Sequence, residues 1–332
     1  MQIKSKPDHK VWMKKIAKYN NPDLKKSIWQ IVNSLVPYIA LWALMIYFYD
    51  ISYWVTLALA IPAAGFMVRI FIIFHDCGHG SFFKSRQANH IVGTIAGILT
   101  FTPYFQWRYE HALHHATSGD LDKRGTGDVW TMTVDEYKAA PFWKRTSYRA
   151  YRNPFVMLFV GPLFMFLIAH RFINKKGKKH ERWSVVYTNA ALVAIAVIMS
   201  LTIGLKVYLL IQIPVLLIAG AAGVWLFYVQ HQFEGVYWER HEKWEFVTAA
   251  IQGSSFYKLP RLLQWFSGNI GFHHIHHVSS RIPNYKLEKC HVENEVFNRV
   301  KPVTLLTSFK SLKFRLWDET QQRLVGFAGV KK

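Results

Sequence analysis

Three short stretches of the sequence concentrate histidines at spacings that suit metal binding. They read HDCGH at residues 75–79, HALHH at 111–115 and HHIHH at 273–277. On a helix, side chains three or four positions apart lie on the same face, so each stretch is expected to point its histidines one way. The spacing leaves His274 turned away and predicts eight converging imidazoles: His75, His79, His111, His114, His115, His273, His276 and His277.

The number and type of these side chains limit the chemistry. A single metal site takes about three or four protein ligands, so eight imidazoles predict two metal ions. Neutral imidazole binds iron, copper, nickel and zinc, and the nitrogens alone do not choose among these metals. One H-x-x-x-H pattern is a weak signal, but two copies of H-x-x-H-H beside it make a chance cluster a poor explanation.

A further histidine, His231 in FYVQHQFEG, directly follows a long apolar run. An ionisable side chain at the end of a membrane span is costly and commonly functional. Two interpretations stay open from the residues alone. His231 is either a structural histidine held by a hydrogen bond or an additional metal ligand.

Long apolar runs are the elements that must position these histidines. Apolar residues make up 51% of the chain and are gathered into runs with few charges, which is typical of membrane spans. Two shorter segments, at about 91–105 and 154–168, are expected to dip into the bilayer or to lie at its surface. Four runs are long enough to cross about 30 Å of hydrocarbon, and they cover about residues 28–49, 51–74, 185–203 and 207–230.

The distribution of charge predicts which side of the membrane the histidines face. The chain has 41 Lys and Arg against 20 Asp and Glu, a net charge of +21. Eight Lys lie within residues 1–26 and six Lys or Arg within 171–183, beside apolar runs, as expected for cytoplasmic loops. The basic residues do not indicate nucleic-acid binding, because the chain shows no such motif and its aromatic residues lie within the spans. The two cysteines, Cys77 and Cys290, are too few for a disulfide framework and fit a reducing cytoplasm.

These observations predict an all-α integral membrane protein with four transmembrane helices and two membrane-dipping or interfacial helices. The three histidine stretches can meet only if an even number of crossings separates them. We therefore expect one domain, residues 1–332, in the cell membrane, with a histidine-rich cytoplasmic cap formed by residues 106–153 and 231–332. The sequence does not indicate an oligomeric state.

The histidine motifs resemble those of the membrane fatty-acid desaturase family, which surround a cytoplasmic di-iron centre. The likeness extends over nearly the whole chain and includes RIFIIFHDCGHGSFF, HHATSGDLDKRGTGDVW, GSSFYKLPRLLQWFSGNIGFHHIHH and IPNYKLE. These stretches are similar to acyl-lipid desaturases of the Bacillus type. The resemblance implies O₂-dependent introduction of a cis double bond, at carbon 5, into acyl chains of membrane phospholipids.

The resemblance also implies a cofactor, a set of ligands and a partner. It implies two iron ions held by the eight clustered histidines, with His231 as an additional ligand. Phe227 stands where some animal relatives have an Asn one helical turn before that histidine, so an Asn ligand is not carried over. No haem-binding or flavin-binding module is recognisable, so the electrons are expected from a small acidic ferredoxin or flavodoxin.

Residues around the histidines are candidates for supporting roles. Carboxylates that accept ring N–H bonds hold an imidazole in its metal-binding tautomer, and the candidates are Asp76, Asp120, Asp122 and Asp128. Aromatic residues beside the motifs could line an acyl-chain tunnel or serve as packing, and they are Trp107, Trp225 and Phe272.

Two other functions remain open at the level of sequence. A fatty-acyl hydroxylase or ketolase could use the same histidines to insert oxygen instead of removing a second hydrogen. A divalent-metal transporter is a more remote alternative, because it predicts histidines in the middle of spans instead of at their ends.

Overall fold

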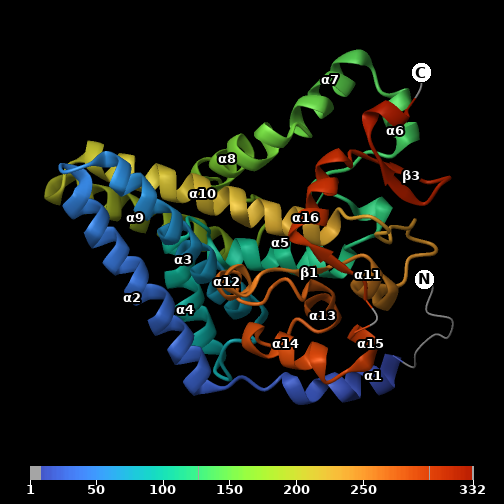
Figure 1. The fold of residues 1–332 in the computed structure, drawn as a ribbon, viewed down its shortest axis with the longest axis horizontal. Coiled ribbons are helices and arrows are strands. Elements are labelled where there is room, and N and C mark those ends of the chain that lie inside the picture. Colours follow the sequence, from blue (N-terminus) through green and yellow to red (C-terminus); the bar gives the residue numbers. More distant parts are fainter. Residues whose placement is uncertain (1–8, 126, 299, 331–332) are drawn as a thin grey trace.

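Two long helical hairpins form the frame of the molecule (Figure 1). The computed structural model describes residues 9–125, 127–298 and 300–330. Helices α2 (Leu24–Tyr49) and α3 (Tyr53–His79) form the first hairpin, and α9 (Lys179–Thr202) and α10 (Leu205–His231) form the second. All four helices are long and apolar enough to cross a membrane. The prediction of four spans in an all-α membrane protein is confirmed.

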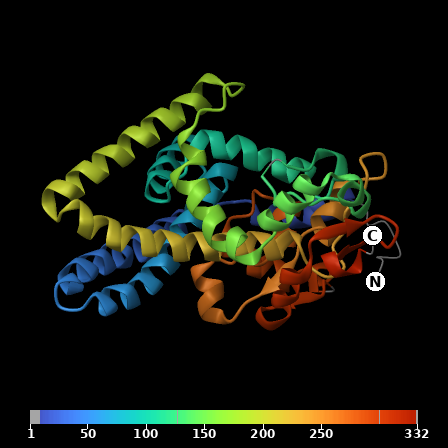
Figure 2. The same cartoon turned by 90° about the horizontal axis from the view of Figure 1, so that it is seen from above.

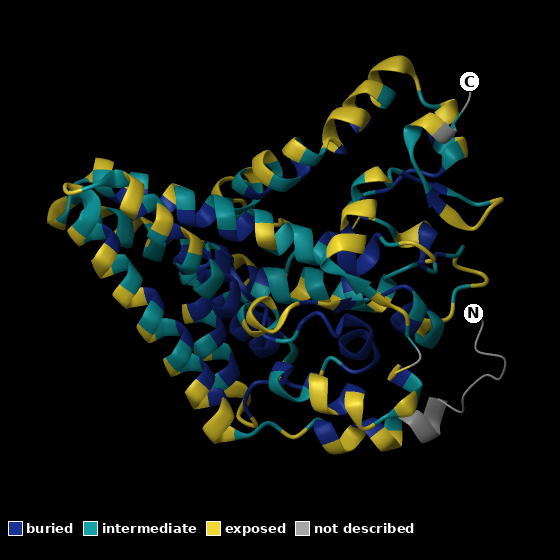
Figure 3. Cartoon of the chain, viewed as in Figure 1, coloured by how far each residue is buried: buried dark blue, intermediate teal, exposed yellow. Residues whose placement is uncertain are grey.

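The two helices of each hairpin differ in how much of their surface lies inside the protein. In their most apolar stretches, 56% of α3 and 39% of α10 are buried, against 17% of α2 and 11% of α9. Figure 2 shows α9 diverging from α10 toward the outside, and Figure 3 shows buried residues gathered on α3. Helices α3 and α10 are therefore the inner pair, while α2 and α9 present apolar surface that suits lipid.

The inner helices end at histidines of the predicted site. Gly80 ends α3 directly after His79, with a left-handed φ of 69° and an N–H that donates to the carbonyls of Asp76 and Cys77. This is the usual role of glycine after the last turn of a helix. Helix α10 has His231 as its last residue. Because both hairpin turns lie at the other end of the molecule in two views, the two histidines lie at one end of the frame (Figures 1 and 2).

Shorter helices connect the hairpins. Helix α4 (Arg86–Leu99) packs along α3, and α5 (Tyr104–Thr117) contacts α9. The segment expected at 91–105 is therefore most of α4 together with the turn before α5. Helix α7 (Phe142–Tyr151) is followed by a π-helical turn, Val156–Val160, and by α8 (Gly161–Leu167).

The segment expected at 154–168 lies in a bent pair of helices. Residues Phe142–Tyr151 and Val156–Arg171 are bent by 64° relative to one another, which is the geometry of a broken span or a re-entrant loop. A Pro at position 154 fits this break, because the residue before a proline is disfavoured in a helix.

The remaining elements surround the ends of α3 and α10. They are mostly short: α1 (His9–Ile16), α6 (Val134–Ala139), α11 (Phe246–Gln252), α12 (Arg261–Phe266), α13 (His273–Val278), α14 (Asn284–Val292), α15 (Glu295–Asn298) and α16 (Leu305–Ser308). Two small sheets add to them. Strands β1 (Phe256–Lys258) and β2 (Pro302–Thr304) pair in parallel, and β3 (Leu316–Asp318) and β4 (Arg323–Val325) pair antiparallel.

Strand β1 fixes the start of α13. The N–H of Tyr257 donates to the carbonyl of Gly271, and that of His274 donates to the carbonyl of Ser255. A Cβ atom on Gly271 would collide with the Tyr257 carbonyl, so glycine is needed for this close approach. Helix α13 is thereby held against the ends of the spans, and Figure 3 shows it among the most buried parts of the molecule.

Candidate metal centre

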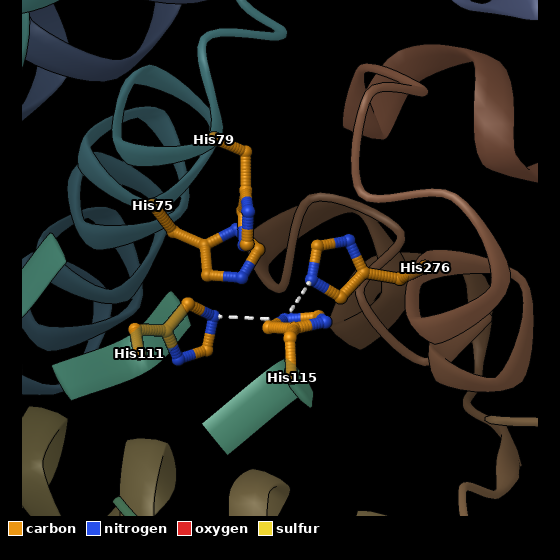
Figure 4. A group of neighbouring side chains, drawn as sticks. All are labelled: His75, His79, His111, His115 and His276. Carbon is orange, nitrogen blue, oxygen red and sulfur yellow. Dashed lines mark hydrogen bonds between the residues drawn. The ribbon is translucent and has the colours of Figure 1, made fainter. Parts of the chain in front are cut away.

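Nine imidazoles meet in two groups where α3, α5, α10 and α13 converge. Within each group, one ring nitrogen from every histidine lies within 4.8 Å of the others. Figure 4 shows five of the rings directed toward a common centre. The five-histidine group consists of His75, His79, His111, His115 and His276, and the four-histidine group consists of His114, His231, His273 and His277. The structure thus brings together all eight clustered histidines and His231.

The two groups do not follow the sequence stretches. His111 and His115, four positions apart on α5, belong to the five-histidine group, whereas His114 belongs to the other. On α13 the pair four positions apart, His273 and His277, lies in the four-histidine group, and the remaining histidine lies in the five-histidine group. The expectation that a stretch points all its histidines one way holds for His75 and His79 but is wrong for the second and third stretches. Consecutive residues on a helix point about 100° apart, and therefore neighbours serve different groups.

The spacing of the ring nitrogens fits a bound metal ion. Two nitrogens that are each about 2.1 Å from one metal, at a right angle, lie about 3.0 Å apart. Five Nε2 pairs have separations of 3.0–3.1 Å, and they are His111–His115, His115–His276, His114–His231, His231–His273 and His273–His277. An Nε2 atom carries either one proton or one lone pair, so one that meets two others cannot form two good hydrogen bonds. A cation held by each group would satisfy these lone pairs.

His79 supports the same conclusion. Its Nε2 atom is buried and has no hydrogen-bond partner among the described residues. Buried polar atoms are nearly always paired, so an unpaired one in the middle of a ring cluster calls for a partner outside the polypeptide.

Two histidines are oriented by neighbours that leave Nε2 free. The Nδ1 atom of His75 lies 3.2 Å from Oδ1 of Asp76, whose Oδ2 accepts the backbone and side-chain N–H groups of Asn284 at 2.7 and 2.8 Å. The Nδ1 atom of His231 lies 3.2 Å from the carbonyl oxygen of Gly253. A ring that donates from Nδ1 presents the Nε2 lone pair to its group, as metal-binding histidines do.

Burial keeps the histidines of α5 and α13 neutral. Desolvation, reinforced by neighbouring imidazoles, holds the pKa well below its usual range in each of His111, His114, His115, His273, His276 and His277. Neutral imidazole is the form that binds metal, so these rings need not lose a proton at neutral pH.

Of the four predicted carboxylates, only Asp76 contacts a histidine of either group. The carboxylate of Asp120 accepts a hydrogen bond from Nδ1 of His241 at 2.7 Å, and that of Asp122 pairs with Arg240 at 2.6 Å. Both of these carboxylates therefore serve the loops around the centre.

Asp128 lies beside the four-histidine group without a direct hydrogen bond to it. Its carboxylate accepts the N–H of Gly125 at 2.8 Å, and burial raises its pKa. It shares with His114, His231 and Phe227 the lining of a cavity of about 10 Å³. That space is about what one water molecule needs.

The predicted aromatic residues pack around the centre. Trp107 stacks on His111, with ring centroids 4.3 Å apart. A Cβ on Gly78 would lie 3.0 Å from the Trp107 ring, so the glycine allows this packing. Trp225 donates from Nε1 to the hydroxyl of Tyr257, and Phe272 stacks on a neighbouring phenylalanine, which gives both of them packing roles.

His274 points away from both groups, as the spacing predicts. Its ring lies 5.5 Å from that of His291 and beside Phe256, and both of its nitrogens are unpaired among the described residues. Burial, followed by the charge of His291, lowers the pKa of His274 to about 3. It is therefore a neutral core histidine.

The supporting residues that sequence reasoning did not find are Asn284, Gly253 and Gly78. Asn284 lies more than 200 positions from the carboxylate that it holds, and Gly253 contributes only its carbonyl group. A backbone carbonyl leaves no trace in a residue pattern. Gly78 lies within the first histidine stretch, where its role as a contact for a tryptophan could not be read from spacing.

Comparison with known proteins decides the family. The profile described as fatty acid desaturase matches residues 52–302. A fatty acid desaturase of Bacillus subtilis (strain 168) is 52% identical over 318 residues, covering 96% of this chain and 90% of that protein. The chain belongs to the fatty acid desaturase family. The expectation of an oxidoreductase enzyme, made from the histidine motifs, is confirmed.

More distant desaturases match a smaller part of the chain. The sn-1 oleoyl-lipid 12-desaturase of Synechocystis is 28% identical over 238 residues, covering 67% of this desaturase and 63% of the relative. The sn-1 acyl-lipid omega-3 desaturase (ferredoxin) of Nostoc is also 28% identical, over 245 residues, covering 66% and 62%. The family match includes every histidine of both groups.

Proposed function

We propose that this desaturase introduces a cis double bond into acyl chains of membrane phospholipids, with O₂ as co-substrate, at two iron ions held by the two histidine groups. The observation that carries the proposal is the arrangement of nine ring nitrogens as two adjacent metal-sized sets at the ends of apolar helices. The cyanobacterial relatives whose names specify acyl-lipid substrates support the lipid class.

Iron is the metal that this reaction requires. The hydrogens of an acyl chain are not acidic, so side-chain acids and bases cannot remove them. Bound iron would supply reductive activation of O₂ and removal of hydrogen from unactivated methylenes, which zinc cannot do because it has no redox chemistry. In the overall reaction the acyl chain loses two hydrogens, and O₂ takes them up with two electrons and two protons to become two waters.

The polypeptide would contribute position, tautomer and exclusion of water. Asp76 would hold the ring of His75 with Nε2 directed inward, and the Gly253 carbonyl would do the same for His231. The four-histidine group is wholly buried, which keeps bulk water from it. Trp107 would fix the ring plane of His111 by stacking.

The electrons are proposed to come from a ferredoxin or flavodoxin that docks by charge. The net charge of +21 suits an acidic partner, and the Nostoc relative is described as using ferredoxin. Turnover with a purified donor should fall steeply as salt is raised, because exposed charges are screened. A rate indifferent to ionic strength would contradict electrostatic docking.

We place the two groups on the cytoplasmic side of the cell membrane, within one domain that includes the whole chain. The basic segments at 1–26 and 171–183 run into the first turns of α2 and α9, and both hairpins return to the side where they began. A thiol reagent added outside the cell should therefore label a cysteine introduced in the α2–α3 turn. It should not label a cysteine introduced in α14.

The position of the double bond is proposed to be carbon 5, from the likeness of the stretches around the histidines to Bacillus-type enzymes. Expression in a host without unsaturated fatty acids, followed by gas chromatography and mass spectrometry of the phospholipid acyl chains, tests both activity and position. Loss of two hydrogens at carbon 5 supports the proposal. Gain of an oxygen atom instead would indicate the hydroxylase alternative.

A further inference from the structure

A basic cavity opens beside the five-histidine group. It has a volume of about 570 Å³ and is lined by the segment just before α2, the end of α3, the start of α4 with the loop before it, Arg108 of α5 and the loop before α14. His79, whose Nε2 is unpaired among the described residues, is part of its lining. The cavity therefore reaches from the surface of the protein to a side chain of the candidate metal centre.

The charge of this cavity is one-sided. Among the described residues, its lining contains no carboxylate. Its four cationic side chains have no ion-pair partner among the residues that the structure describes. They come from three separate segments and are Lys84, Arg86, Arg108 and Arg281. Four like charges around one space repel each other, so the arrangement favours an anionic occupant.

Two of the four cationic side chains of the cavity are partly held by hydrogen bonds. Nε of Arg108 donates to the carbonyl of Gly78 at 2.9 Å, and Nε of Arg86 donates to Nε2 of His90 at 3.2 Å. Burial, followed by Arg108 and Arg86, lowers the pKa of His90, which reflects the positive potential of the site. The guanidinium NH₂ groups of these two arginines donate no hydrogen bond within the described part of the chain, which leaves them to bind an anion. Arginine suits a phosphate, because its fork of donors matches two oxygens.

The surroundings of the cavity indicate that the anion belongs to a lipid. Helix α2 exposes the apolar side chains of Leu24 and Ile28 from its first turns. Helix α4 likewise exposes Ile91 and Ile95 beyond the cavity. The cavity thus lies beside the ends of two helices whose outer faces are apolar, which is where a bilayer around those faces would present phospholipid headgroups. An acidic loop of a soluble electron donor would meet this boundary only by entering the lipid surface.

We propose that this cavity binds the phosphate headgroup of the phospholipid whose acyl chain is desaturated. The inference rests on the proposed function, because it assigns the same lipid as headgroup ligand and as substrate. A double bond near the carboxyl end of a chain requires the phosphate of the headgroup to lie within about ten bonds of the reacting carbons. A phosphate site whose cavity also includes His79 of the metal centre meets that requirement. The distance from this site to the metal centre would then determine which carbons of the acyl chain react.

The test compares two double variants of the full-length protein in detergent. Arg86→Gln with Arg281→Gln removes two charges from the cavity, while Arg261→Gln with Arg323→Gln removes two exposed charges elsewhere. Short-chain phosphatidylglycerol, diacylglycerol of the same chain length and inorganic phosphate are titrated separately, with tryptophan fluorescence as the readout. Iron content and thermal midpoint are measured for each variant, so that misfolding is seen directly.

The proposal expects the parent to bind phosphatidylglycerol at least about tenfold more tightly than diacylglycerol, as one charge-assisted hydrogen bond provides. The cavity variant should lose this preference, and the control variant should keep it. Inorganic phosphate that binds as tightly as the lipid would overturn the assignment in favour of a free-phosphate site. Equal affinities for the two lipids in the parent would also overturn it.

A kinetic measurement separates the lipid from the electron donor. In the cavity variant, the KM for phospholipid should rise while the KM for the donor stays unchanged. The reverse result would make the cavity a docking site for the donor and contradict the proposal. Because the binding titration needs no turnover, a parent that binds the lipid but forms no double bond would count against the proposed function and not against the headgroup site.

Discussion

The two histidine groups are built from the same helices but differ in what lies beside them. The four-histidine group is buried throughout, and only a cavity with room for about one water adjoins it. The five-histidine group contains three partly exposed residues and adjoins a cavity of about 570 Å³. One histidine group is therefore closed to ligands, and the other can be approached through the larger cavity.

Removal of one ligand from either group should have the largest effect. We expect His276→Ala and His273→Ala each to lower product formation at least about 100-fold, since even changes behind a metal ligand cost about 10- to 100-fold. Each variant should also contain less iron, measured by elemental analysis of purified protein. His274→Phe, a change of the histidine that faces the core, should retain both iron and activity. Full activity after loss of a ligand in one group would end the claim that both groups are needed.

A change behind the five-histidine group should have a smaller effect. Asp76→Asn removes the carboxylate that fixes the tautomer of His75 but keeps an oxygen for Asn284. We expect iron affinity to fall by about 10- to 100-fold, measured by competition with a chelator. Asp122→Asn, which changes the surface pair with Arg240, is the matched control and should change iron affinity little. Equal effects of the two substitutions would remove the special role of Asp76.

Acid should destabilise the metal-free protein through both groups. The α5 and α13 histidines have a folded pKa well below the usual value of about 6.5, so below that pH the unfolded chain binds more protons than the folded one. The contribution of these rings to the free energy of unfolding is therefore fully present above about pH 6.5 and is lost as the pH falls toward their lowered folded-state pKa. Thermal unfolding between pH 8 and pH 5 checks this. A midpoint that rises on acidification would show that the rings are not held neutral.

The packing of Trp107 against the five-histidine group should give the smallest effect. A methyl group at Gly78 would press on that ring, so Gly78→Ala should cost about 1–3 kcal/mol of stability. Gly223→Ala on α10, where nothing lies within 4 Å of the added atom, should cost no stability. Unfolding midpoints of the two variants in the same detergent make the comparison. If Gly223→Ala lowered the unfolding midpoint as much as Gly78→Ala does, the tight contact between Gly78 and the Trp107 ring would be contradicted.

Much of the frame could be predicted from the sequence because its signals are local. The four apolar runs gave spans whose ends differ from α2, α3, α9 and α10 by only a few residues. The segments at 91–105 and 154–168 were harder, because a short apolar run can be an interfacial helix, a broken span or a turn. In the second one the two helical parts are bent by 64° at a break that includes Pro154, and the part after the break contacts α10, a contact that the apolar run itself does not encode.

The identity of the site residues was easier to predict than their partners. Histidine spacing named eight of the imidazoles, and His231 followed from its place at the end of an apolar run and from the family resemblance. The helical period could also have separated His114 from His115, since neighbours on a helix diverge. The contacts of Asp76 with Asn284 and of His231 with a carbonyl depend on distant segments meeting in space. Asp120 and Asp122, which follow the second stretch closely in the sequence, pair with His241 and Arg240 instead.

The metal content of active enzyme tests the central claim most directly. Purified protein with measured desaturase activity should contain about two iron ions per chain, the number that nine imidazoles in two sets predict. A folded and active preparation that contains no iron would contradict the account.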